Sequence, residues 1–104
     1  MEQHREPYTL GIWKVKPGNE NSFIAEWRAL AVWTEQYVDS GGTGYLLRDD
    51  ANPRLFISFG SRKNTQVIAE WRSTPEFQAF FTKAKTMCEE VQPHSMNLVA
   101  TSQP

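Results

Sequence analysis

The spacing of apolar residues along this 104-residue chain changes several times, and each change marks the border of an expected helix or strand. Residues 8–15 are rich in β-forming side chains and are followed by a Lys-Pro-Gly turn at 16–18, which predicts a strand. Apolar residues then recur at helical spacing between Phe23 and Val38, which predicts a helix. Asn19 is expected to cap this helix, and the Ser-Gly-Gly sequence at 40–42 to end it near residue 39.

The middle of the chain has the pattern of a β-hairpin. Residues 44–49 and 54–61 are short segments that favour strands. The Asp-Ala-Asn-Pro sequence at 50–53 lies between them and is typical of a turn. We therefore expect the second and third strands to pair with each other.

The last third of the chain predicts two short helices and a final strand. Asn64 is expected to cap a helix that reaches Trp71, and Pro75 to take the first position of the next helix. Pro93 is expected to break that second helix, so that residues 95–100 form the last strand. The apolar stripe of the second helix consists of Phe77, Phe80, Phe81, Ala84, Met87, Cys88 and Val91.

The order of these elements is β-α-β-β-α-β, with the second helical region split in two. This order is typical of the ferredoxin-like fold of the α+β class, a four-stranded antiparallel sheet with helices on one face. The length is close to that of an ordinary single domain. We therefore expect one domain over residues 1–104, with an ordered core at about 8–100.

Both faces of the predicted sheet carry apolar side chains, although helices can cover only one of them. Neighbouring residues of a strand point to opposite faces of the sheet. In the first strand, Leu10 and Ile12 share one face, and Trp13 and Val15 share the other. In the third strand, Leu55, Ile57 and Phe59 share one face, and Phe56 is on the other. A bare apolar face is unusual for a monomer. We expect a homodimer that pairs through its sheet faces; the alternative is that a few aromatic side chains lie in water.

Composition and charge restrict the classes of function. The formal net charge is −1 without a basic cluster, which argues against binding to nucleic acid. No apolar stretch approaches the roughly 20 residues that cross a bilayer, and residues 1–7 lack the pattern of a secretory signal, so we expect no membrane partner. The single cysteine, Cys88, excludes an internal disulfide and a multi-cysteine metal site. A cytoplasmic protein is the simplest interpretation, with Cys88 as a small core residue.

Four segments resemble the antibiotic biosynthesis monooxygenase (ABM) family. They are the sequence WKVKPG at 13–18, the Phe23 to Trp27 part of the first helix, FISF at 56–59 and EWRSTPEF at 70–77. The likeness extends from about residue 8 to 99. It implies a dimeric α/β barrel with a pocket in each subunit between helices and sheet. The family includes cofactor-independent monooxygenases that oxidise aromatic phenols with O2, quinol oxidases and haem-degrading enzymes, and many members without an established activity.

The haem-degrading branch of that family can be compared position by position. It uses an Asn in the first strand, a Trp at the end of the helix after the third strand, and a His ten residues later. Trp71 matches the Trp, whereas Gly11 and Phe81 stand at the positions of the Asn and the His. Phe cannot ligate iron and Gly has no side-chain amide, so we expect no haem degradation by that mechanism. The resemblance to cofactor-independent monooxygenases implies no cofactor, and the sequence has no metal triad, so we expect no metal. A peroxidase-like use of haem is disfavoured on the same ground.

Oxidation without a cofactor requires an electron-rich substrate, a group that deprotonates it or accepts its hydrogen bond, and a dry pocket. His94 could be the base, because it is the only histidine of the predicted fold; the alternative is a solvent-facing side chain at the strand end. Asn97 could bond a substrate hydroxyl or a neighbouring strand. Arg48 could hold an anionic oxygen or form a surface ion pair. Four aromatic side chains could form walls of the pocket, with core packing as the alternative: Trp33, Tyr45, Trp71 and Phe80. The phenol of Tyr37 or Tyr45 could also contact a substrate.

Two functions of different classes follow from these observations. The first is a cofactor-independent monooxygenase of the ABM type that oxidises a phenol or quinol-type small molecule, with Trp71 as a pocket wall, His94 as base and Asn97 beside them. The second is a non-catalytic homodimer of the same fold with a binding or structural role. An enzyme needs a titratable or amide group inside its aromatic cavity, whereas a structural dimer fills that space with side chains. No phosphate loop or nucleotide-binding motif is present in the sequence.

Overall fold

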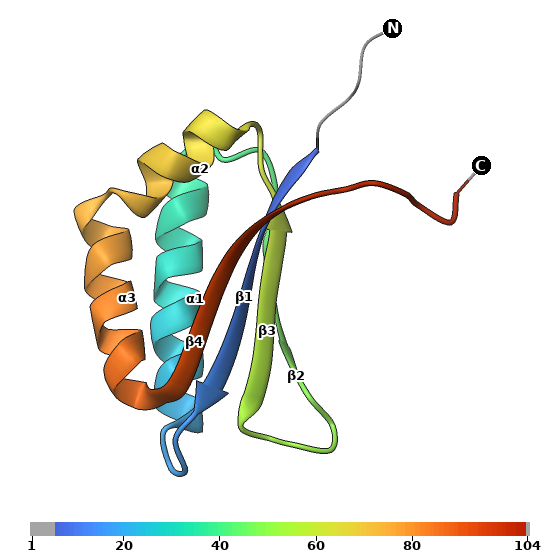
Figure 1. Cartoon of the computed structure of the whole chain (residues 1–104). Coiled ribbons are helices and arrows are strands. Elements are labelled where there is room, and N and C mark those ends of the chain that lie inside the picture. Colours follow the sequence, from blue (N-terminus) through green and yellow to red (C-terminus); the bar gives the residue numbers. More distant parts are fainter. Residues whose placement is uncertain (1–5, 104) are drawn as a thin grey trace, which may run out of the picture.

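Four antiparallel strands form a single sheet in the order β2-β3-β1-β4, and three helices lie together on one side of it (Figure 1). The computed structural model describes residues 6–103, so the remaining residues, including His4, lie outside the described part of the chain. This topology confirms the expected ferredoxin-like fold. The elements are β1 (Pro7–Val15), α1 (Glu20–Tyr37), β2 (Gly44–Arg48), β3 (Leu55–Ser61), α2 (Thr65–Arg72), α3 (Pro75–Met87) and β4 (Cys88–Asn97).

The predicted hairpin joins β2 to β3. Arg48 pairs with Phe56 at its closed end, and the Asp49 N–H donates to the Leu55 carbonyl at 3.0 Å. Inside the turn, the Asn52 N–H donates to Asp49 Oδ2 at 2.7 Å. Such Asx contacts replace strand pairing where the chain reverses.

One of the two predicted helix caps is confirmed, and so is the expected start of α3 at Pro75. Asn64 Oδ1 accepts from the Val67 N–H at 2.7 Å, and Thr74 Oγ1 accepts from the Phe77 N–H at 3.2 Å, just before the proline that starts α3. The prediction for Asn19 was wrong, because its side chain makes no capping hydrogen bond. The expected end of α1 was also displaced: the helix stops at Tyr37, since Val38 is already extended, before any glycine.

The prediction of the last strand at residues 95–100 was wrong at both ends, because β4 begins at Cys88 and ends at Asn97. Helix α3 ends at Met87, and the chain continues at once as β4, so that Val91 and Pro93 lie within a strand. Strand β4 is at the edge of the sheet and pairs with β1, with Pro93 opposite Gly11. A proline is tolerated on an edge strand, where its missing N–H can face outward. Pairing with β1 therefore outweighs the helical spacing of these residues.

The core fills the space between the helices and the sheet. Phe23, Phe56 and Val15 are its largest fully buried side chains, and Leu30, Phe77 and Phe80 complete its aromatic and aliphatic centre. The first-helix stripe is confirmed, because Phe23, Leu30 and Thr34 are buried. Within the described residues, no helix is long and apolar enough to cross a membrane.

The opposite face of the sheet has no layer of helices over it (Figure 1) and is apolar, as predicted. Tyr45, Leu47 and Ile57 are 52%, 55% and 37% exposed, and Tyr45 stacks on Phe59 with ring centroids 5.4 Å apart. Met96 of β4 is also exposed. This set of side chains is called the open face below.

Candidate functional site

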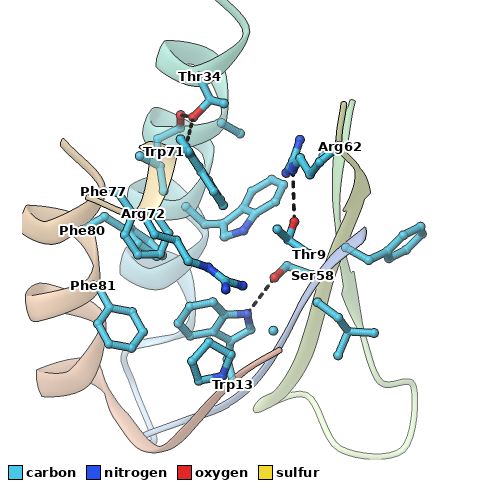
Figure 2. Close-up of a pocket in the computed structure, with 18 of the residues that line it drawn as sticks. Thr9, Trp13, Thr34, Ser58, Arg62, Trp71, Arg72, Phe77, Phe80 and Phe81 are labelled. Carbon is cyan, nitrogen blue, oxygen red and sulfur yellow. Dashed lines mark hydrogen bonds between the residues drawn. The ribbon is translucent and has the colours of Figure 1, made fainter. Parts of the chain in front are cut away.

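A cavity of about 60 Å³ lies between the helices and the covered face of the sheet (Figure 2). Its wall is mostly aromatic, but hydroxyl groups and two guanidinium groups also reach it. The side chains that define it are Thr9, Trp13, Trp27, Thr34, Ser58, Arg62, Trp71, Arg72, Phe77, Phe80 and Phe81. Aromatic walls with a few polar groups are typical of sites for small organic molecules.

Trp71, near the end of α2, is held in one orientation. Its indole N–H donates to Thr34 Oγ1 at 2.9 Å, and the Thr34 hydroxyl donates to the Leu30 carbonyl at 2.7 Å. Phe77 meets its ring edge-on with centroids 4.7 Å apart. The hydrogen bond fixes the plane of the indole, so that Trp71 forms a wall of fixed orientation.

Trp13 forms another wall from β1. Its indole N–H donates to Ser58 Oγ on β3 at 3.0 Å, and Phe80 packs edge-on at 5.6 Å between centroids. Gly11, two residues before it on the same face, leaves room for the indole: a Cβ at position 11 would stand 2.7 Å from Trp13 Nε1. Glycine is therefore required where Trp13 folds back along its own strand.

Arg62 faces the cavity because it continues the alternation of Phe56, Ser58 and Gly60 past the end of β3. Its Nε donates to Thr9 Oγ1 at 3.1 Å and its Nη1 to the Gly42 carbonyl at 3.2 Å. The guanidinium carbon lies 5.0 Å from the centroid of the Trp71 ring. A Cβ on Gly60 would lie 2.9 Å from the Thr43 carbonyl oxygen and 3.0 Å from Arg62 Nη2, so this glycine leaves room for both groups.

Arg72 reaches the cavity from the last residue of α2 and attaches that helix to β4. Its Nη1 donates to Ser95 Oγ at 2.9 Å and its Nη2 to the His94 carbonyl at 3.0 Å. Burial lowers the pKa of Arg72. Burial also lowers the pKa of Arg62, and the charge of Arg72 lowers it further, against a weaker opposite effect of Glu35.

Of the residues predicted for the site, the structure brings Trp71 and Phe80 to the cavity. His94 is not on its lining: it pairs with Leu10, on the face opposite to Trp13, whereas its neighbour Pro93 lines the cavity. The expected grouping of His94 with Trp71 is therefore absent, and only the His94 carbonyl approaches this side through Arg72.

The other predicted site residues also lie away from the cavity lining. Asn97 is exposed at the end of β4. Tyr37 is 71% exposed and packs on Trp33 with centroids 5.9 Å apart, and Tyr45 belongs to the open face. Arg48 lies over the Phe56 ring at 4.9 Å, outside the cavity.

A haem or a metal ion does not fit the side chains of this cavity. Phe81 lines it and stacks on Phe77 at 5.8 Å between centroids, so a ring stands where an iron ligand would be needed. Trp13 fills the space beside Gly11. Among residues 6–103, no group of three or more His, Cys, Asp or Glu residues is arranged to hold a metal ion.

Comparisons with known proteins identify the fold. No protein-family model matches the chain, and no curated protein matches it. Among solved structures, a Nitrosomonas europaea protein provisionally assigned as an antibiotic biosynthesis monooxygenase superimposes with a TM-score of 0.82 at 14% identity, covering 95% of each chain.

Two further structures agree. An antibiotic biosynthesis monooxygenase gives a TM-score of 0.77 at 14% identity, covering 91% of this chain and 98% of that one. Rv0793 from Mycobacterium tuberculosis gives 0.81 at 11% identity, covering 94% and 99%. The chain has the fold of the antibiotic biosynthesis monooxygenases.

Proposed function

We propose that this protein is a cofactor-independent monooxygenase that oxidises a small phenol or quinol with O2 inside the cavity. The observation that carries the proposal is the combination of aromatic walls from Trp13, Trp71 and Phe80 with the hydroxyl and guanidinium groups at their edges. Aromatic walls bind a planar substrate and exclude water, and the polar groups orient its oxygen atoms. The fold shared with proteins named as monooxygenases supports the same reaction class.

The size of the cavity favours a small substrate. About 60 Å³ gives room for roughly four to six water molecules, which corresponds to one aromatic ring with a few substituents. A three-ring phenol would have to extend beyond this space. We therefore expect single-ring quinols to be better substrates than polycyclic phenols.

The chemistry needs no external reductant. The substrate supplies all the electrons that reduce O2: one oxygen atom enters a ring carbon, the other leaves as water, and the quinol becomes a hydroxylated quinone. The first requirement is an ionised phenol, because the phenolate gives up an electron far more readily than the neutral phenol. A guanidinium such as that of Arg62 stabilises the phenolate and so lowers the pKa of the bound substrate.

Oxygen uptake with hydroquinone tests the proposal. We expect uptake above autoxidation in buffer, with label from isotopic O2 in both the hydroxylated quinone and water. Trp71→Phe, which removes the N–H that fixes the wall, should lower the rate, whereas Arg28→Gln on the exposed surface of α1 should not. If single-ring quinols give no uptake above buffer, or if the label is absent from the quinone, the proposal is wrong.

A binding protein without chemistry is the second candidate, and one observation favours it. The lining within the described residues contains no imidazole, and its one carboxylate is that of Glu35, an exposed residue of α1. A conventional general base is therefore missing beside the aromatic walls. Saturable binding of hydroquinone without oxygen uptake would select this function over the first.

We also propose that two copies pair through the open face. Its exposed apolar side chains, Tyr45, Leu47 and Ile57, lie side by side on the hairpin, and a second copy would remove them from water. Light scattering should give twice the chain mass of 12.0 kDa. Ile57→Glu should yield monomer, whereas Val32→Glu, at an exposed apolar position on α1, should remain dimeric. A monomeric wild-type protein at micromolar concentration would contradict the pairing.

A further inference from the structure

The cavity beside Trp71 contains two positive charges and little that neutralises them. The guanidinium groups of Arg62 and Arg72 both reach it, from the end of β3 and the end of α2 (Figure 2). The ion pairs found within residues 6–103 join other side chains, and neither of these arginines takes part in one. Glu35 lines the cavity as well but forms an ion pair with neither.

Each guanidinium also keeps hydrogen-bond donors for a ligand. Arg62 uses two of its five N–H groups, toward Thr9 and the Gly42 carbonyl. Arg72 likewise uses two, toward Ser95 and the His94 carbonyl. The existing bonds hold each planar group in place, so the remaining N–H groups are positioned in advance for an oxygen acceptor.

This arrangement is electrostatically unfavourable until an anion joins it. Burial beside aromatic rings disfavours a charged group, and the two like charges disfavour each other, as the lowered pKa of Arg62 reflects. Both arginines are partly buried, and charged groups that folding takes out of water are normally paired. The cation–π contact of Arg62 with Trp71 offsets part of the cost and leaves the net positive charge unchanged.

We propose that the cavity binds a small aromatic acid, with its carboxylate on Arg62 and Arg72 and its ring against Trp13 and Trp71. The phenolic part of such a substrate rests on the proposed oxidation, whereas the carboxylate rests on the two arginines alone. A guanidinium fork matches a carboxylate in shape as well as in charge. A free inorganic phosphate is a poorer match, because it leaves the aromatic walls without a partner and is strongly hydrated.

Two ligands of the same shape distinguish the contribution of the carboxylate charge to affinity from that of the aromatic ring. Benzoate is an anion at neutral pH, and benzamide is its neutral counterpart. Calorimetric titration of the full chain should give an affinity for benzoate at least about tenfold higher than for benzamide, since hydrogen bonds to charged groups are the strong ones. The preference should shrink as salt is added, because salt screens the partly exposed arginines.

Substitution of the two arginines tests whether they cause the preference for benzoate over benzamide. Arg62→Gln and Arg72→Gln should each reduce the benzoate-to-benzamide ratio by about tenfold or more, and Arg62→Lys should restore part of it. Arg28→Gln, on the exposed surface of α1 and outside the cavity, is the matched control and should leave the ratio unchanged. The ratio is measured within each variant, so a partial loss of folded protein lowers both affinities alike and does not mimic the effect.

The outcomes distinguish this inference from the proposed oxidation. Equal affinity for benzoate and benzamide, an unchanged ratio in both Gln variants, or tighter binding of inorganic phosphate than of benzoate would each overturn it. If 2,5-dihydroxybenzoate binds in preference to hydroquinone but consumes no oxygen, the anion site stands and the oxidation fails. If both quinols are oxidised with the same KM, the oxidation stands and the anion site fails.

Discussion

The hydrogen bond between Trp71 and Thr34 gives a prediction that tests how the cavity wall is held. Thr34→Val keeps the branched shape of the side chain and removes the hydroxyl that accepts the indole N–H at 2.9 Å. Thr34 is only 4% exposed, so its hydroxyl lies away from bulk water. The variant therefore leaves a donor of Trp71 without a partner inside the protein.

The expected cost follows from that orphaned donor. A buried polar group without a partner costs about 1–3 kcal/mol, and a chain of this size loses about 1–3 kcal/mol of stability per molar urea. The midpoint of urea unfolding should therefore fall by roughly 1 M. Thr34→Ser, which keeps the hydroxyl, should lose less than Thr34→Val despite its smaller side chain. All variants are compared at one protein concentration, since pairing of copies would add to the apparent stability.

A double-mutant cycle isolates the hydrogen bond itself. In the Trp71→Phe background the indole N–H is absent, so the hydroxyl of Thr34 no longer accepts a hydrogen bond from residue 71. Thr34→Val should then cost about 1–2 kcal/mol less than it does in the wild-type protein. Additive effects of the two substitutions would refute the assigned role of Thr34, and the indole would have to be held by packing alone.

Three further predictions concern the caps, the cysteine and the core. Asn64→Ala should lower the free energy of unfolding by about 0.5–2 kcal/mol, as measured by urea unfolding. Asn19→Ala should lower it clearly less, because only the Asn64 side chain makes a capping hydrogen bond. Burial raises the pKa of the Cys88 thiol from 9.0 to about 11, so the unfolded chain ionises first. The contribution of Cys88 to stability should be present below pH 9 and lost as the pH rises toward 11, a loss that Cys88→Ala should lack. Phe23→Ala, at a fully buried site, should cost about 3–5 kcal/mol in the same assay; a cost below 1 kcal/mol would contradict its central place.

Much of the fold could be predicted because local signals and tertiary packing agree over most of the chain. The hairpin turn at 50–53, the cap at Asn64, the start of α3 at Pro75 and the stripe of α1 are all local patterns that the packed structure retains. The start of β4 could not be predicted, because Cys88 and Val91 fit a helical stripe as well as a strand. Their state is decided by pairing with β1, which is remote in sequence.

The candidate site was less accessible to sequence reasoning. Trp71 was found through the family resemblance, whereas Arg62 was missed, although the alternation from Phe56 through Ser58 and Gly60 points it to the helix side. His94 was misplaced because the face that it shares depends on the register of β4 against β1, which the sequence does not reveal. For Arg72, next to Trp71 on α2, no local pattern distinguishes a cavity residue from a surface one.

Binding of a small aromatic acid in the cavity beside Trp71 can be followed at the tryptophans themselves. The most direct measurement follows the indole N–H signals of the four tryptophans by NMR while benzoate is added. Trp13 and Trp71 line the cavity, and Trp33, which does not, serves as an internal reference. We predict saturable shifts of the Trp13 and Trp71 signals with little change at Trp33. Shifts confined to Trp33, or no saturable shift of any indole signal, would contradict binding of an aromatic acid in this cavity.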